Sequence, residues 1–190
     1  IYWRERMRHH TIDPLNPESF ELIKSLIDQY VPNFTSDKFN ICCDETFDLG
    51  AGKNAGKDKG RLYVDFVRKI VDYVKSKGKT PMMWGDVIIK HADLIDDIGD
   101  GIIYLSWGYS KDEKPDAVNK VRDAGKHQYV CPGLNNWASL IELPQISVPN
   151  ITKMTKYGYD AGAIGVLNTC WGDYGHPSSI YACLYGMIFG

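Results

Sequence analysis

The sequence lacks the features that mark several large classes of protein. No apolar run among its 190 residues approaches the ~20 residues that a membrane-spanning helix needs. A formal net charge of −2 gives no reason to expect nucleic acid or a membrane as a partner. No basic-then-apolar signal sequence opens the chain. With 44% hydrophobic and 24% charged residues, the composition is that of an ordinary globular protein, and we expect one domain over residues 1–190.

The five cysteines are an odd number, and their positions match no zinc-binding spacing. Cys42, Cys131 and Cys170 lie in or just after apolar runs, as buried free thiols do in reducing compartments. We therefore expect a cytoplasmic protein, or a secreted or cell-surface one if a signal lies upstream. The sequons at Asn33 and Asn150 are too short to decide between these locations.

Nucleotide-binding motifs are missing as well. The loop 50–60 is rich in glycine and lysine, but it has neither the spacing of a phosphate cradle nor a Gly-Lys-Ser/Thr step. No dinucleotide fingerprint follows the first β-prone run, which weighs against a Rossmann fold.

What the chain does contain is a regular alternation of β-prone and helical segments. After a helix that starts at Asp13–Glu18, the pattern predicts strands at 38–43, 80–84, 102–107, 128–131 and 163–168 and helices at 59–77, 87–98, 115–124, 148–161 and 178–189. Such alternation predicts an α/β fold with parallel strands and helical crossovers. Because each strand ends in polar and aromatic residues, we expect part of a (β/α)8 TIM barrel, about strands 4 to 8. The first helix, or strands upstream, would cover the open edge.

Two adjacent carboxylates, Asp44 and Glu45, end the first predicted strand. Successive side chains of a regular strand point to opposite faces, so the pair shares a site only if the backbone bends there. Two carboxyl groups in one pocket can hold different protonation states, as glycoside hydrolysis requires. The alternative is a polar strand end that faces water.

Four tryptophans give a second signal, because each lies at or just after a different predicted strand: Trp84, Trp107, Trp137 and Trp171. Aromatic rings stack on the apolar C–H faces of sugars. One such tryptophan is usually a core residue, but four from four strands favour a sugar site. Their polar neighbours are Asp86, Asn135, Asn136, Asp173 and His176. Asp86 and His176 would otherwise be helix caps.

Taken in order, these segments resemble glycoside hydrolase family 20, the β-N-acetylhexosaminidases. The resemblance covers nearly the whole chain and rests on five segments: Asn40–Glu45, Met83–Asp86, Trp107, Pro132–Trp137 and Asn168–His176. It implies an exo-acting enzyme that removes terminal N-acetylhexosamine by a retaining, substrate-assisted mechanism, without a metal or organic cofactor. The expected partners are glycans that end in N-acetylglucosamine or N-acetylgalactosamine, and a homo-oligomer stays open.

The resemblance also implies a role for each candidate residue. Glu45 would protonate the leaving glycosidic oxygen and then activate water. Asp44 would orient and stabilise the substrate's own 2-acetamido group, which attacks the anomeric carbon. Trp84, Trp107 and Trp137 would surround the acetamido group and the sugar. Trp171 would stack beneath the sugar ring, and Asp173 would bind its outer hydroxyls. Asn135 and Tyr109 would be further substrate-binding residues.

The chain departs from the family pattern at three points. The family has a histidine and two glycines before the carboxylate pair, where this chain has Asn40, Cys42 and Cys43. Its acetamido-binding tyrosine has no clear match, and Tyr109 and Tyr129 are the candidates. Its sugar-binding arginine, from the first barrel strand, has no counterpart here.

Two other functions stay open. A non-catalytic sugar-binding or truncated barrel protein would keep the aromatic residues. A metal-dependent barrel enzyme would use Asp44, Glu45, Asp86 and Asp173 as oxygen ligands, although four tryptophans are unusual company for such a cation.

Overall fold

The computed structural model describes residues 10–175 and 177–190. The chain divides into two compact units, Ile1–Ile103 and Tyr104–Gly190. The strand order is that of the sequence, β1-β2-β3-β4-β5. The parallel pairs are β1 with β2 and β4 with β5. The α/β fold with parallel strands is therefore confirmed, while the single catalytic domain stays a prediction. His176, predicted as a polar partner or cap, lies outside the described residues.

The first unit alternates helices with two parallel strands. Its elements are α2 (Pro17–Tyr30), η1 (Val31–Asn33), β1 (Lys38–Asn40), η2 (Gly52–Asn54), α3 (Lys59–Ser76), β2 (Thr80–Trp84) and η3 (Ile88–Ile98). Asn16 caps α2 by accepting a hydrogen bond from the Glu18 N–H, and Asp58 caps α3 by accepting one from the Arg61 N–H. Both helices therefore begin where polar residues satisfy their first backbone donors.

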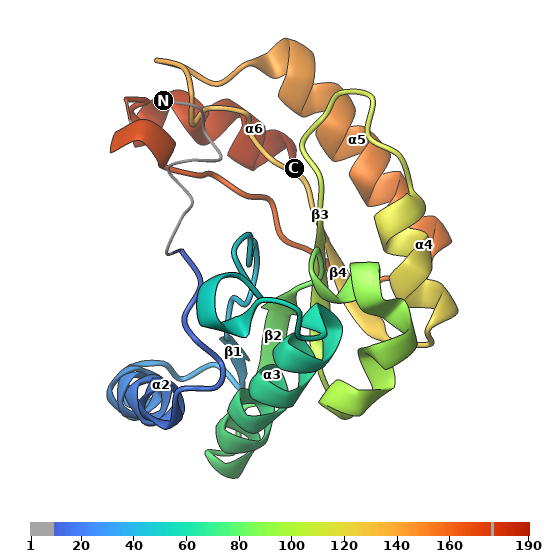
Figure 1. Ribbon diagram of the computed structural model, residues 1–190. Helices are drawn as coiled ribbons and strands as arrows, with labels where there is room; N and C mark the ends of the chain where they lie inside the picture. The colour runs from blue at the N-terminus through green and yellow to red at the C-terminus, as the bar shows by residue number, and fades with distance from the viewer. Residues whose placement is uncertain (1–9, 176) are drawn as a thin grey trace. The chain divides into compact units, whose positions relative to one another are not determined.

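The core of this unit lies between the two helices. Phe66, Ile70 and Val74 of α3 pack against Ile27 and Val31, so α2 covers α3 beside β1 (Figure 1). An apolar cavity of about 390 Å³ lies along α2, α3 and β1. The first helix thus packs beside the end strand, and its covering of the open sheet edge stays a prediction.

Two predicted elements of this unit differ from the structure. The predicted strand 38–43 ends at Asn40, because the backbone turns left-handed at Cys42 and Cys43. The predicted helix 87–98 is the 3-10 segment η3, which is kinked at His91 (φ −128°, ψ 47°). Gly60 of α3 approaches this segment closely, since a Cβ there would lie 2.8 Å from Leu94.

The second unit continues the alternation. Its elements are β3 (Ile103–Trp107), α4 (Asp116–Asp123), β4 (His127–Cys131), α5 (Pro144–Asp160), β5 (Gly165–Val166), η4 (Asp173–Gly175), η5 (Ile180–Cys183) and α6 (Leu184–Phe189). Val118, Val130 and Met154 form a core cluster, so α4 and α5 pack on the same side of β4 (Figure 1). Gln128 is buried there and links Ser106 to the carbonyl of Val118.

Three predicted elements of this unit also change. Helix α5 begins at Pro144 rather than Val148, because Pro144 fills the first helical turn, where a missing N–H costs nothing. Strand β5 has two residues instead of the predicted 163–168. The predicted helix 178–189 is a 3-10 turn followed by the short α6. Within the described ranges no helix is both long and apolar enough to cross a membrane.

Candidate functional site

The backbone bends at the carboxylate pair of the first unit, as the sequence required for Asp44 and Glu45 to share a site. Pairing with β2 continues past β1, through Ile41 N–H to Met82 O (2.8 Å) and Trp84 N–H to Cys42 O (3.0 Å). The chain then turns left-handed, with φ of 60° at Cys42, 68° at Cys43 and 50° at Glu45. Non-glycine residues rarely adopt this conformation. Regular strand alternation is therefore lost, and both carboxylates are half-buried.

Three side chains hold this bend through its backbone groups. Asn40 accepts a hydrogen bond from the Cys42 N–H at 2.9 Å. The Tyr63 hydroxyl donates to the Cys43 carbonyl at 2.7 Å, and Asp86 accepts from the Glu45 N–H at 3.2 Å. The segment that follows Asp86 has no side-chain cap. Asp86 therefore supports the backbone of Glu45.

The thiol at the bend is not set up as a nucleophile. Burial, Cys42 and the carboxylates of Asp44 and Asp86 raise the pKa of the Cys43 thiol far above its usual range. A thiol attacks only as the thiolate. Cys43 therefore stays protonated at neutral pH.

The loop after the carboxylates is tied to the segment before α2. Asp48 accepts a hydrogen bond from the Thr11 N–H at 2.9 Å. Asp13 accepts one from Asn54 at 2.7 Å and forms an ion pair with Lys53 at 2.6 Å. Hydrogen bonds from Lys53 and Asn54 lower the pKa of Asp13 to about 2. Asp13 thus fixes the glycine- and lysine-rich loop. Lys53 is used in this ion pair, so its charge is not evidence of an anion-binding site.

In the second unit, three of the predicted tryptophans gather around Tyr109. The rings of Trp107 and Tyr109 are stacked, with their centroids 5.1 Å apart. The ring of Trp137 lies edge-on to that of Tyr109, with a centroid distance of 5.0 Å. Trp171 donates from Nε1 to the Tyr109 hydroxyl at 2.8 Å. All four side chains are half-buried, so ring surface stays open to a ligand. We call Trp107, Tyr109, Trp137 and Trp171 the aromatic cluster.

The structure separates the two candidate tyrosines. Tyr109 is at the centre of the aromatic cluster, whereas the ring of Tyr129 lies against β5, 2.7 Å from where a Cβ of Gly165 would be. The ring of Tyr129 therefore packs over Gly165 of β5, and Tyr109 is the better candidate for a sugar contact.

The other predicted residues fall into three environments. Trp84 is 5% exposed at the end of β2. Asn135 donates to the carbonyls of Tyr109 and Gly133, both at 3.1 Å, and buried Asn136 donates to that of Trp171 at 3.1 Å. Asp173 is exposed in η4. Asn135 and Asn136 thus hold backbone in place, and the sugar-binding roles of Trp84, Asn135 and Asp173 stay predictions.

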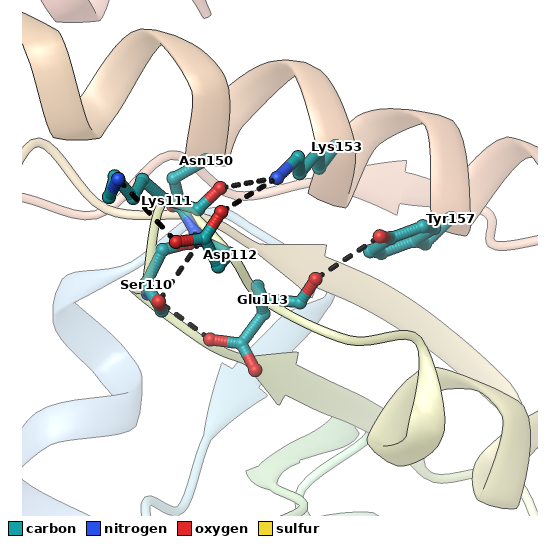
Figure 2. Close-up of polar contacts among 7 residues, drawn as sticks. All are labelled: Ser110, Lys111, Asp112, Glu113, Asn150, Lys153 and Tyr157. Atoms are coloured by element: carbon teal, nitrogen blue, oxygen red, sulfur yellow. Dashed lines mark hydrogen bonds and ion pairs between the residues drawn. The ribbon is translucent and has the colours of Figure 1, made fainter.

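One residue was missed by reading the sequence. Asn150 of α5 is fully buried and links the loops after β3 and β4. Figure 2 shows it beside Ser110 of the first of these loops. The sequence marked it only as a sequon, but burial and its hydrogen bonds leave this amide inaccessible to glycosylation. The available signal was a polar residue among the apolar positions of a predicted helix.

Among residues 10–175 and 177–190, no three histidine, cysteine or acidic side chains are grouped as metal ligands. The predicted metal ligands are divided, with Asp44, Glu45 and Asp86 in the first unit and Asp173 in the second.

Comparison with known proteins identifies structures that share this fold. No family model matches the sequence. It is 31% identical to lacto-N-biosidase of Bifidobacterium bifidum over 119 residues. This matched region covers 55% of this chain and 10% of that protein. The structure matches a GH20 exo-β-N-acetylglucosaminidase of Vibrio harveyi with a TM-score of 0.61 and 16% identity, over 94% of this chain and 32% of that one. It matches Dispersin B with a TM-score of 0.57 and 18% identity, over 85% of this chain and 54% of that one.

These similarities establish the fold. The chain has the fold of part of a family 20 glycoside hydrolase barrel, and it spans about half or less of the length of the proteins that it matches. The predicted fold class and the predicted resemblance are both confirmed at this level.

Proposed function

We propose that this chain belongs to an exo-acting β-N-acetylhexosaminidase that removes terminal N-acetylhexosamine from glycans. The observation that carries the proposal is the left-handed bend at Asp44 and Glu45, which turns two adjacent carboxylates out of strand alternation in a chain with this hydrolase fold. A strand end that merely faced water would not need three side chains to hold a strained backbone.

In this proposal the reaction is retaining and substrate-assisted. Glu45 gives its proton to the leaving glycosidic oxygen while the acetamido oxygen attacks the anomeric carbon. Asp44 stays anionic and stabilises the positive charge that develops on the acetamido group. Glu45 then takes a proton from a water molecule whose oxygen bonds to the anomeric carbon. The bond from that carbon to the acetamido oxygen breaks, which frees the sugar and leaves Glu45 protonated and Asp44 anionic, as at the start.

The aromatic cluster would bind the sugar. Half-buried rings of Trp107, Trp137 and Trp171 offer apolar faces, and Tyr109 adds a hydroxyl at their centre. We assign Tyr109 to the acetamido group on this basis, with Trp84 and Asp173 as further sugar contacts. The glycans would end in N-acetylglucosamine or N-acetylgalactosamine.

The proposal is tested by comparing two substrates, an aryl β-N-acetylglucosaminide and the matching β-glucoside. The chain is expressed with the residues that naturally flank it. Cleavage of the acetamido sugar alone is expected, because the nucleophile lies in the substrate. Equal cleavage of both would overturn substrate assistance. Binding of N-acetylglucosamine without cleavage of either would favour a non-catalytic sugar-binding protein.

A further inference from the structure

Asn150 uses every hydrogen-bonding group of its amide inside the second unit. The side chain is fully buried on α5. Its Nδ2 donates to the carbonyls of Gly108 and Ser110, both at 2.9 Å, and its Oδ1 accepts from the Gly133 N–H at 3.0 Å. An amide offers two donors and an acceptor oxygen. Asn150 therefore joins the loop after β3 to the loop after β4.

These two loops carry the rings of the aromatic cluster. Tyr109 lies between Gly108 and Ser110, so Asn150 fixes its backbone on both sides. Gly133 lies under the rings, since a Cβ there would be 2.7 Å from Cδ1 of Tyr109 and 3.1 Å from Cη2 of Trp137. The position of Gly133 relative to residues 108–110 thus sets how Tyr109 and Trp137 meet.

The same face of α5 also holds the outer part of the first loop. Lys153 donates to the carbonyl of Lys111 at 2.6 Å, and the Tyr157 hydroxyl donates to that of Glu113 at 3.1 Å (Figure 2). These contacts lie beyond Ser110 and do not reach Gly133. They stabilise the loop without joining it to the loop that carries Trp137.

We propose that Asn150 is a positioning residue that determines the preference of the aromatic cluster for acetamido sugars. The inference rests on the proposed function, in which Tyr109 and Trp137 contact the acetamido group. When the amide is removed, the hydrogen bonds to Gly108, Ser110 and Gly133 are lost. The hydrogen bond from Asn135 to the Tyr109 carbonyl still links the two loops, but it does not fix Gly133 relative to residues 108–110. The rings therefore lose the spacing that fits this group. Binding of the rest of the sugar depends less on that spacing.

The test measures tryptophan-fluorescence titrations with N-acetylglucosamine and with glucose. Asn150→Asp has the same shape but cannot donate to Gly108 and Ser110. We expect about a tenfold loss of affinity for N-acetylglucosamine, with the affinity for glucose unchanged within about twofold. Tyr157→Phe, which removes one outer hydrogen bond, is the matched control and keeps the wild-type ratio of affinities. Gly133→Ala keeps Asn150 but displaces the same rings, so it should reproduce the loss.

Folding is checked by circular dichroism at the titration temperature. If Asn150→Asp does not fold, Asn150→Ala, which removes the amide without adding a charge, is measured in its place. A folded variant that keeps the wild-type ratio overturns the inference, and so does an equal loss of preference in Tyr157→Phe. A wild type without any preference overturns the proposed function itself, and this is seen before any variant is made.

Discussion

The carboxylate bend and the aromatic cluster are held by opposite means. At the bend, the backbone takes an unfavourable conformation at three non-glycine residues, Cys42, Cys43 and Glu45. Around Tyr109, side chains pack on one another, and a buried amide joins the loops behind them. The one left-handed non-glycine residue described in the second unit is Asn135, a residue type that tolerates this conformation.

The difference teaches where each region is vulnerable. Left-handed backbone costs roughly 1–2 kcal/mol per residue, so the bend persists only while its partners hold it. The carboxylate geometry therefore depends on a few hydrogen bonds to backbone groups. The aromatic cluster spreads its stability over ring contacts, and single polar changes at its rim should matter less.

The largest expected effect separates chemistry from binding. Glu45→Gln keeps the size of the side chain but removes the proton that the proposed mechanism transfers. We expect kcat to fall by about 10²–10⁴-fold, while the affinity for N-acetylglucosamine, assigned to the aromatic cluster, stays unchanged. Steady-state kinetics and a fluorescence titration check the two halves. Glu21→Gln, at an exposed position on α2, is the control and should change neither. Wild-type activity in Glu45→Gln would contradict the assignment.

The next largest effect tests the support of the bend. Asp86→Ala removes the acceptor of the Glu45 N–H. Because hydrogen bonds to charged groups are worth about 1.5–3 kcal/mol, we expect kcat to fall by about tenfold or more. Asp86→Asn keeps an oxygen acceptor and should lose less. Equal kinetics in Asp86→Ala and the wild type would show that the Glu45 geometry does not need this contact.

The sequence predicted those parts of both regions that depend on periodicity and strand order. Helix α3 and strand β2 were placed almost to the residue, because α3 has a long apolar stripe and β2 is bounded by Gly78 and Gly85. The carboxyl ends of parallel strands meet at one edge of a sheet. This rule predicted that four tryptophans share one rim. Trp107, Trp137 and Trp171 gather around Tyr109, and the place of Trp84 at that rim stays a prediction.

The rest could not be predicted from local pattern. Cysteine gives no signal for a left-handed backbone, so the first strand was predicted to extend to Cys43 instead of Asn40. The one signal in the comparison with the family was that it has glycines where this chain has Cys42 and Cys43. The role of Asn150 depends on a loop that lies 42 residues away in the sequence. Tyr109 was separated from Tyr129 only when the ring contacts were known.

A matched pair of tyrosine changes sharpens the comparison. Tyr63→Phe removes the hydroxyl that donates to the Cys43 carbonyl at the bend. Tyr157→Phe removes the hydroxyl that donates to the Glu113 carbonyl in the loop after β3. Because Tyr63 is buried under a strained segment, we expect its loss to lower the free energy of unfolding by about 1–1.5 kcal/mol. The Tyr157 change should cost about 0.5 kcal/mol or less. Denaturant unfolding measures both, and a larger loss in Tyr157→Phe would contradict the comparison.

Acid should weaken the attachment of the carboxylate loop. The pKa of Asp13 is lowered from its ordinary 3.8 to about 2 by Lys53 and Asn54. A lowered pKa in the folded state stabilises the protein above the unfolded value, and this contribution is lost as the pH falls through the folded value. The loss should therefore occur between about pH 4 and pH 2. Asp13→Asn should be less stable than the wild type at pH 6, and the difference should shrink across this window. A constant difference would contradict the assignment.

The smallest effect tests the left-handed backbone itself. At an ordinary position glycine is about 0.5–1 kcal/mol less stable than alanine, because it loses more conformational freedom on folding. At Cys42, with φ of 60°, the order should reverse, since only alanine keeps the Cβ that the left-handed conformation disfavours. We expect Cys42→Gly to be more stable than Cys42→Ala by about 0.5–1 kcal/mol in thermal unfolding. Because both changes remove the same thiol, the difference reports the backbone alone. If Cys42→Ala were the more stable, the left-handed conformation at Cys42 would carry no cost in stability. The contrast between a strained bend and a well-packed aromatic cluster would then be wrong.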